Sequence, residues 1–275
     1  MKRALTIAGS DSGGGAGIQA DLKTFCTFGV YGMTAVTSVT AQNTREVRAI
    51  YDLEPVMVRK QIEAVCEDIG VDAAKTGMLS NADIIVMVAQ AIQQYRIEKL
   101  VVDPVMVAKS GDVLLRPGAL TALEHNLLPL TWIITPNLPE AELLSGITVS
   151  SPAEMKEAAR IIRNKGPRYV LIKGGHLPGD RMVDLLYDGE KWVEYPVTRI
   201  LTKNTHGTGC TYSAALCALL ALGYGMEEAV KVAREYMDTV IQHALPLGQG
   251  YGPTNHLAPF FLKAGMDPRE GGRVW

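Results

Sequence analysis

The sequence lacks the features that would assign it to nucleic acid or to a membrane. Its 275 residues include 27 basic and 29 acidic side chains, giving a formal net charge of -2. Without a basic excess, we expect no nucleic-acid partner. No apolar run approaches the ~20 residues that a membrane-spanning helix needs, so we expect no membrane insertion. The apolar N-terminal stretch stops at a polar group at residues 10–12, a poor match to a secretory signal.

Cysteine is also scarce, and its spacing excludes two common uses. The four cysteines are Cys26, Cys66, Cys210 and Cys217, and no two form a CxxC pair. A zinc knuckle or a thioredoxin-type motif is therefore absent. Thiols without a disulfide framework are typical of a reducing compartment, so we expect a cytoplasmic protein.

What is present predicts one large α/β domain. The chain is 47% hydrophobic, enough for a single core spanning residues 1–275, with a polar tail from about residue 262. Short β-rich runs alternate with helical patterns. We expect strands at 4–9, 32–40, 73–76, 100–102, 132–135 and 169–173, a hairpin of 182–187 with 192–196, and helices at 18–28, 55–69, 81–95, 153–165, 211–222 and 227–245. Strands that are apolar on both faces predict a mostly parallel sheet covered by helices on both sides.

A glycine-rich segment at residues 9–17 (GSDSGGGAG) follows the first expected strand. Glycines let the backbone approach a ligand and expose amide groups at a helix start. The segment is not a Walker P-loop, because no Lys-Ser/Thr pair follows it. A loose dinucleotide match at Gly15, Gly17 and Ala20 lacks the acidic residue at the end of a second strand. The alternative is a strand–helix turn without a ligand.

A second glycine motif, residues 204–210 (NTHGTGC), precedes a long apolar helix. Gly207, Thr208 and Gly209 would leave unpaired N–H groups at the positive helix end, which suits an anion such as a transferring phosphate. Cys210 lies at the same end, where the pKa of a thiol can fall from about 8.5 into the range ~3.5–7.5. We therefore predict a thiolate base at Cys210. The alternative is a cysteine that only packs.

Polar residues follow three other expected strands. Asp103 and Glu140 place carboxylates at strand ends, and Mg²⁺ often uses one or two carboxylates together with substrate phosphates. The alternative for each is a helix cap or a surface turn. Lys173 can reach a phosphate as a point charge, and Gly174 and Gly175 leave room for a nucleotide. The alternative is a solvated surface lysine.

Taken together, these motifs resemble the hydroxymethylpyrimidine/phosphomethylpyrimidine kinases of thiamine biosynthesis, within the ribokinase-like superfamily. Five segments carry the resemblance in order: residues 9–21, 103–106, 136–140, 173–176 and 207–210. It extends from residue 2 to about residue 261. The resemblance implies a ribokinase-like three-layer α/β/α fold. It also implies ATP- and Mg²⁺-dependent phosphorylation of 4-amino-5-hydroxymethyl-2-methylpyrimidine and then of its monophosphate. A homodimer is implied by analogy with relatives.

The resemblance also implies roles for single residues. Cys210 matches the catalytic base, which is Asp in most of the superfamily. The remaining implied roles are an anion hole at Gly207, Thr208 and Gly209, magnesium binding at Asp103, Asn137 and Glu140, ATP binding at Lys173, Gly174 and Gly175, and a pyrimidine pocket of Gln42, Asp21, Met78 and Val105. A glutamine carries both a donor and an acceptor, so it could pair with the ring nitrogen and exocyclic amine of an aminopyrimidine.

Two other functions stay open. Pyridoxal kinases share the fold and many of the motifs, so vitamin B6 kinase is the alternative, as main or side activity. A non-catalytic pyrimidine sensor would need the pocket but not Cys210, Glu140 and Lys173 together. A sugar kinase is disfavoured because the sequence has no recognisable substrate-lid segment. His256 receives no role, and the sequence does not decide whether the second phosphorylation occurs.

Overall fold

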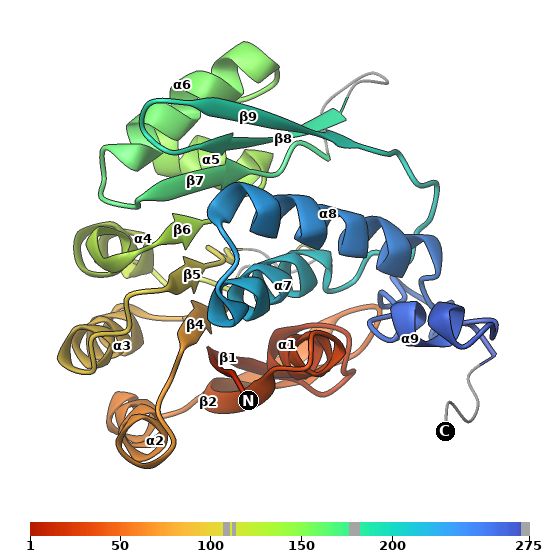
Figure 1. Ribbon diagram of the computed structural model, residues 1–275. Coiled ribbons are helices and arrows are strands. Elements are labelled where there is room, and N and C mark those ends of the chain that lie inside the picture. Colours follow the sequence, from red (N-terminus) through yellow and green to blue (C-terminus); the bar gives the residue numbers. More distant parts are fainter. Residues whose placement is uncertain (107–110, 112–113, 176–181, 271–275) are drawn as a thin grey trace.

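The computed structural model describes residues 1–106, 111, 114–175 and 182–270 (Figure 1). Within these residues the strands form one nine-stranded sheet in the order β3-β2-β1-β4-β5-β6-β7-β8-β9. The strands are β1 (Arg3–Asp11), β2 (Tyr31–Gln42), β3 (Val47–Asp52), β4 (Ala73–Thr76), β5 (Leu100–Val102), β6 (Ile133–Ile134), β7 (Tyr169–Ile172), β8 (Met182–Tyr187) and β9 (Trp192–Val197). Pairing is parallel from β2 to β7, and β3, β8 and β9 join antiparallel at the two edges.

Helices cover both faces of the sheet, so the fold has three layers (Figure 1). One layer contains α2 (Pro55–Asp68), α3 (Ala82–Gln94), α4 (Ala119–Ala122), α5 (Leu138–Ser145) and α6 (Pro152–Arg163). The other contains α1 (Gly17–Thr27), α7 (Thr208–Leu222) and α8 (Met226–Gln242), with α9 (Ala258–Lys263) beside the end of α8. This arrangement confirms the expected α/β/α architecture.

The apolar pattern of the strands explains the layers. Leu5 and Ile7 of β1 are fully buried in the core beneath α2 and α3, whereas Ala4 lies in the core beneath α1, α7 and α8. Alternate strand residues point to opposite faces, so a strand that is apolar throughout needs cover on both sides. Among the described residues, no helix combines the length and the apolar character needed to cross a membrane.

Most expected elements are confirmed within a few residues, including the β8–β9 hairpin. The short helices α4 and α9 were not expected, and three further regions differ. Strand β3 was missed because it is an exposed edge strand without an apolar run on both faces. Helix α5 was missed because its proline-containing first turn resembles an irregular loop. Helix α7 begins at Thr208 rather than residue 211, so the second glycine motif forms the helix start itself.

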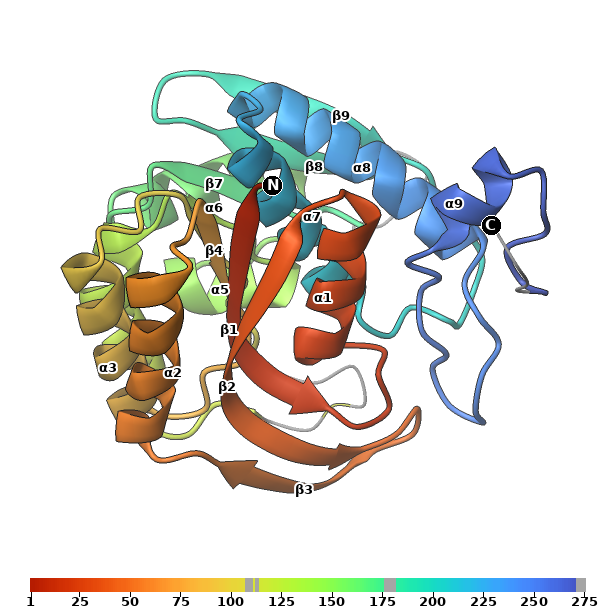
Figure 2. The same ribbon diagram turned by 60° about the horizontal axis from the view of Figure 1, so that its bottom comes forward.

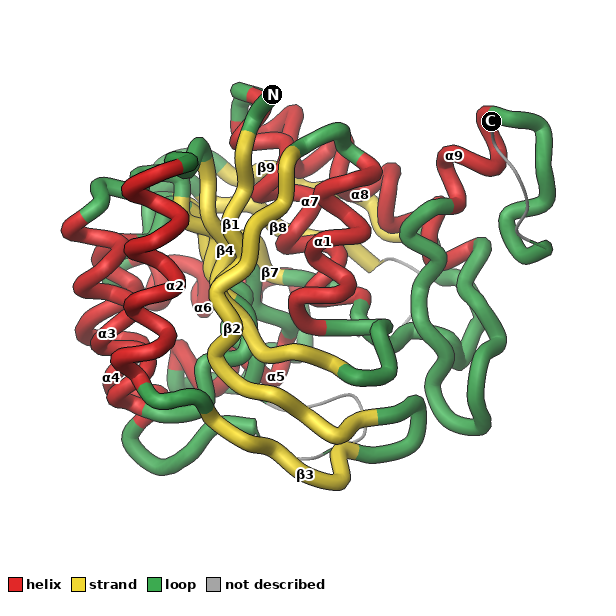
Figure 3. The backbone as a smooth tube through the Cα atoms, turned by 90° about the horizontal axis from the view of Figure 1, so that it is seen from below, coloured by secondary structure: helices red, strands yellow, loops and turns green. Residues whose placement is uncertain are grey.

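The strand order predicts where a ligand binds. The chain passes from β1 to β2 on one side and later to β4 on the other side of β1. The loops after β1 and β4 therefore diverge, and a crevice forms at the carboxyl ends of these strands. Figures 2 and 3 show β2 and β3 curving out together beyond this edge of the sheet.

Candidate active site

A cleft of about 760 Å³ lies at the carboxyl edge of the sheet. Segments after β1, β4, β5, β6 and β7 line it, together with the N-terminus of α7. All but two of the residues predicted from sequence are on its wall: Gln42, Met78, Val105, Asp103, Asn137, Glu140, Lys173, Gly175, Gly207, Thr208, Gly209 and Cys210. The two that are not are Asp21 and Gly174.

The first turn of α7 forms one side of the cleft. Gly207 is the N-cap residue and has φ 81°, a left-handed conformation that favours glycine. The hydroxyl of Thr211 donates to the carbonyl oxygen of Gly207 at 2.7 Å and holds this turn. Because the first amides of a helix have no acceptor within it, those of Gly209 and Cys210 can serve an anion in the cleft.

The glycine-rich loop after β1 docks against this helix start through a residue that the sequence analysis missed. The carboxylate of Asp11 accepts from the amides of Gly13, Gly15 and Ala16 at 2.8–3.0 Å. It also pairs with Nε2 of His206 at 2.8 Å. Burial alone would raise the pKa of Asp11, but His206 and the amides outweigh burial and lower it. The sequence feature that could have identified Asp11 is an acidic residue inside a glycine-rich loop.

The environment of Cys210 differs from the expectation of a thiolate. Burial raises the pKa of the Cys210 thiol to about 11. Lys75 opposes this rise, whereas the carboxylates of Asp21 and Asp103 add to it. The amide of Gly17 also lowers the pKa by donating to the sulfur. The prediction of a lowered pKa is therefore wrong, because burial and two nearby anions outweigh Lys75 and the Gly17 amide.

Asp21 has a different role from the predicted pocket lining. Its carboxylate pairs with Nζ of Lys75 at 2.9 and 3.0 Å and accepts from the hydroxyl of Thr6 at 2.6 Å. Both charged side chains are completely buried. This ion pair lies behind the cleft wall, between α1 and β4, and acts on the cleft only through its charge. Lys75 was missed because a lysine in a short apolar strand gives no sequence signal.

A second group of charges lies where β5, β6 and β7 end. Nζ of Lys173 pairs with Oδ1 of Asp103 at 3.2 Å, and the hydroxyl of Ser213 donates to Oδ2 at 3.2 Å. Burial raises the pKa of Glu140 to about 7, with Lys173 opposing the rise and Asp103 adding to it. Burial alone would lower the pKa of Lys173, but Asp103 and Glu140 outweigh it. The predicted lysine is thus held between two carboxylates rather than solvated.

Asn137 and Glu140 form a capping box at the start of α5. The Asn137 side chain accepts from the Glu140 amide at 2.9 Å, and the Glu140 carboxylate accepts from the Asn137 amide at 2.8 Å. The Asn-x-x-Glu pattern thus has a structural use, although both residues also line the cleft. Among the described residues, no cluster of three or more His, Cys, Asp or Glu side chains could hold a metal alone.

Gln42 is the last residue of β2 and lines the cleft. Its Oε1 accepts from the hydroxyl of Thr40 at 3.2 Å. Its backbone is tied to the glycine-rich loop, because the Gln42 amide donates to Oγ of Ser12 at 2.8 Å. Met78 lines the same end, and a Cβ atom at Gly9 would lie 2.7 Å from the Met78 Cε. The predicted pyrimidine residues other than Asp21 are therefore brought together.

Gly174, which was predicted to bind ATP, does not line the cleft. Its amide donates to Oδ1 of Asp184 on β8 at 2.9 Å, and the residue lies behind the cleft wall. Asp184 and its partner Arg234 on α8 do line the cleft and were both missed. They lie in the β8–β9 hairpin and in the last long helix, where nothing in the local sequence marks them. His176, the last residue of the 173–176 motif, lies outside the described residues.

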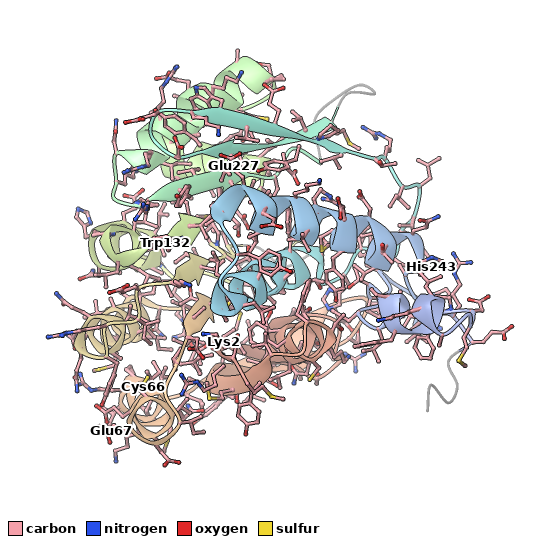
Figure 4. The ribbon with its side chains drawn as sticks, in the orientation of Figure 1. Lys2, Cys66, Glu67, Trp132, Glu227 and His243 are labelled. Carbon is pink, nitrogen blue, oxygen red and sulfur yellow. The ribbon has the colours of Figure 1, made fainter. Side chains whose placement is uncertain are left out.

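The other cysteines do not compete with Cys210. All four cysteines in the described chain are free thiols. Figure 4 shows Cys66 on α2, in the outer helical layer and well away from α7. Cys26 is exposed on α1, and Cys217 is buried in the middle of α7. Neither Cys66, Cys26 nor Cys217 lines the cleft.

The cleft therefore combines the amide groups at the start of α7, a charged cluster and a polar pocket in one crevice. A family model for phosphomethylpyrimidine kinase matches residues 11–255. The chain belongs to this family. The expected kinase identity and the ribokinase-like fold are thereby confirmed.

Individual relatives agree with the family assignment. The hydroxymethylpyrimidine/phosphomethylpyrimidine kinase of Bacillus subtilis is 50% identical over 257 residues, which are 93% of this chain and 95% of that protein. The thiamine biosynthesis bifunctional protein ThiED of Geobacter sulfurreducens is 50% identical over 253 residues, and the chain spans about half of its length (52%). A Bacillus subtilis pyridoxal kinase, solved as an ADP complex, superposes with TM-score 0.88 at 45% identity, covering 94% of this chain and 98% of that chain.

Proposed function

We propose that this kinase transfers the γ-phosphoryl group of ATP to 4-amino-5-hydroxymethyl-2-methylpyrimidine and then to the resulting monophosphate. The observation that carries the proposal is the shared cleft: Gln42 at one end, Lys173 at the other, and Cys210 at the helix start between them. A cleft of about 760 Å³ is large enough for a nucleotide beside a small ring. The relatives' names support the choice of substrate.

In the proposed reaction, the substrate hydroxyl attacks the γ-phosphorus, the bond to the bridging oxygen of ADP breaks, and the hydroxyl proton passes to Cys210. The amides of Gly209 and Cys210 would hold the phosphoryl oxygens as charge builds on them. Lys173 would neutralise charge on the nucleotide. Gln42 would orient the ring so that its hydroxymethyl group faces the sulfur.

The proton acceptor must be the thiolate of Cys210, which is scarce near pH 7 because the pKa of the thiol is raised to about 11. Asp103 is one cause of that rise. A cation bound beside Asp103 would remove part of it, and Lys75 already favours the thiolate. We therefore propose that the base becomes competent in the loaded cleft.

Mg²⁺ is part of the proposal. Asp103, Asn137 and Glu140 all line the cleft, and their side chains offer the hard oxygen ligands that suit this ion. Asp103 adds to the raised pKa of Glu140, and a divalent cation beside both carboxylates would oppose that rise. When bound with ATP phosphates, the ion would supply positive charge to the transferring group.

Vitamin B6 kinase is the second candidate, because the similar Bacillus subtilis structure is a pyridoxal kinase. Pyridoxine, like the pyrimidine, is a flat nitrogen ring with a hydroxymethyl group. The ratio of the kcat/KM values for the two alcohols decides between them. Mass spectrometry of the pyrimidine product scores one or two added phosphates. Absence of ADP release with ATP, Mg²⁺ and either alcohol would instead favour a non-catalytic sensor.

A homodimer and a cytoplasmic location complete the proposal. Edge strand β3 is open for pairing, and Tyr51 is 69% exposed on it, next to Val39 of β2 at 48%. Analytical ultracentrifugation tests the dimer. The free thiols support a reducing compartment.

A further inference from the structure

A buried pair of opposite charges closes one end of the cleft. Asp184 on β8 is 1% exposed, and its Oδ2 lies 3.4 Å from Nη1 of Arg234 on α8. Both residues line the cleft. Figure 4 labels Glu227 at the start of α8 and His243 after its end, and Arg234 lies midway along this helix. The pair therefore joins the centre of α8 to the sheet.

Asp184 also holds the segment that carries Lys173. Its Oδ1 accepts from the buried amide of Gly174 at 2.9 Å. On the other side, the amide of Lys173 donates to the carbonyl oxygen of Pro136 at 2.8 Å. Two successive amides are thus fixed from two directions. The backbone from which the Lys173 ammonium extends is set by Asp184, and Asp184 is held by Arg234.

Stability alone is a weak reason for such a pair. Removing two charges from water costs more than their attraction returns unless the geometry is excellent, and apolar residues of similar volume often replace buried pairs without loss. Here the single contact of 3.4 Å is long for a charged hydrogen bond. The pair is therefore better explained as two charged side chains that hold neighbouring groups in position.

Two buried polar atoms beside the pair lack a hydrogen-bond partner, and both belong to residues that line the cleft. Nε of Arg234 and the hydroxyl of Tyr212 are buried and have no hydrogen-bond partner among the described residues. Asp184 lies near enough to that hydroxyl to help burial raise the pKa of Tyr212, without a well-formed hydrogen bond. Met182, Met237 and Ile241 line the adjoining wall of the cleft. An apolar wall beside the polar side chains of Tyr212 and Arg234 suits a flat ring that carries acceptor atoms, as a nucleotide does.

We propose that Asp184 and Arg234 are positioning residues for the nucleotide, fixing the Gly174 amide and thereby the reach of Lys173. This inference rests on the proposed function, which assigns ATP to the Lys173 segment. If the pair only held α8 against the sheet, its loss would lower the free energy of unfolding. It would leave nucleotide affinity unchanged in the folded protein. Nucleotide affinity therefore separates the two roles.

The test uses Arg234→Gln and the matched control Asp238→Asn. Asp238 is the other carboxylate that Arg234 contacts, at 2.7 Å, and it is partly exposed on the outer side of α8. We expect Arg234→Gln to raise the Kd for ADP with Mg²⁺, measured by calorimetry, and the KM for ATP by about tenfold. The KM for the pyrimidine should change less than about twofold, and Asp238→Asn should leave all three values unchanged. Arg234→Lys, which keeps the charge, should recover part of the loss.

A folded Arg234→Gln protein that binds ADP as tightly as the wild type would overturn the proposal. If that variant does not fold, Asp184→Asn/Arg234→Gln provides the test, because it leaves no buried charge alone. We expect the double variant to fold and to bind ADP several-fold more weakly, and wild-type affinity would again overturn the inference. Failure of the proposed function gives a different result: wild-type protein that binds ADP but phosphorylates no pyrimidine.

Discussion

Gly207 packs directly against the carbonyl oxygen of Gly15, and a Cβ atom at position 207 would overlap that oxygen. The two glycine motifs, far apart in sequence, therefore form one unit. The hydrogen bond between His206 and Asp11 joins the same two segments. A Cβ atom at Gly15 would in turn overlap the His206 ring. The position of the α7 start, and hence of its amides and of Cys210, depends on this close approach.

Gly207→Ala should therefore damage both stability and turnover. The left-handed conformation alone costs an alanine about 1–2 kcal/mol, and the overlap with Gly15 adds to this. We expect a fall in the free energy of unfolding well above 2 kcal/mol, and a loss of kcat in whatever protein remains folded. Urea denaturation and a steady-state assay measure the two effects.

Gly223→Ala is the matched control at the other end of the same helix. Gly223 has φ 97°, but a Cβ atom there would meet nothing within 4 Å. Its substitution should cost only the conformational strain of about 1–2 kcal/mol and leave kcat unchanged. Equal effects of the two substitutions would show that the contact between the glycine motifs is unimportant.

Cys210→Ala should abolish most turnover while ATP still binds. Removal of a general base typically costs about 10²–10⁴-fold in rate. The raised pKa of about 11 predicts that the thiolate fraction of the free enzyme grows with pH. The kcat/KM of the wild type should therefore rise by up to about tenfold per pH unit above pH 7, because this ratio reports ionisations of the free enzyme. Turnover assays at pH 7–10 measure the slope.

Cys26→Ala supplies the control for that experiment, because Cys26 is exposed on α1 and does not line the cleft. It should behave as the wild type at every pH. A Cys210→Ala protein with wild-type turnover would remove the base from the mechanism. An unchanged slope in a weakly active Cys210→Ala protein would assign the ionisation to another group.

The residues that could be predicted from sequence lie directly after strands. Asp103 and Lys173 follow parallel strands, so the α/β architecture alone places them at one edge of the sheet. Cys210 was found because glycines precede a long apolar helix. For these residues the local sequence shows where each lies relative to a strand or a helix. The α/β fold then determines which of them come together in space.

The missed residues depend on partners that are distant in sequence. Lys75 meets Asp21 only because β4 lies beside β1, and Arg234 meets Asp184 only because α8 packs near β8. Burial also reversed the expected shift of the Cys210 pKa. The degree of burial and the number of nearby carboxylates are properties of the assembled core, and no local pattern contains them.

Gln42→Ala should weaken pyrimidine binding with little effect on ATP. Loss of the amide would leave polar atoms of the ring unpaired, at about 1–3 kcal/mol. We expect the KM for the pyrimidine to rise accordingly while the KM for ATP stays within about twofold. Gln93→Ala, an exposed change on α3, controls for the loss of a glutamine. An unchanged pyrimidine KM in Gln42→Ala would exclude Gln42 from recognition.

His256, which has no role on sequence grounds, supports the α7 start from behind. Its Nε2 lies 3.0 Å from the hydroxyl of Thr211. Because that hydroxyl donates its proton to the carbonyl oxygen of Gly207, His256 donates through Nε2. Burial, with smaller contributions from Lys23 and His206, lowers the pKa of His256 to about 3.

This lowered pKa predicts an acid-sensitive fold. Below about pH 6.5 the unfolded chain takes up a proton at His256 and the folded chain does not until about pH 3, so the free energy of unfolding falls as the pH falls. Between pH 7 and 5 this residue should account for about 2 kcal/mol. The urea midpoint should therefore fall less between pH 7 and pH 5 in His256→Gln than in the wild type. The glutamine keeps a donor for Thr211. His125→Gln, at an exposed position, should leave the drop unchanged. Equal drops in all three proteins would mean that His256 is protonated as readily in the folded state as in the unfolded one.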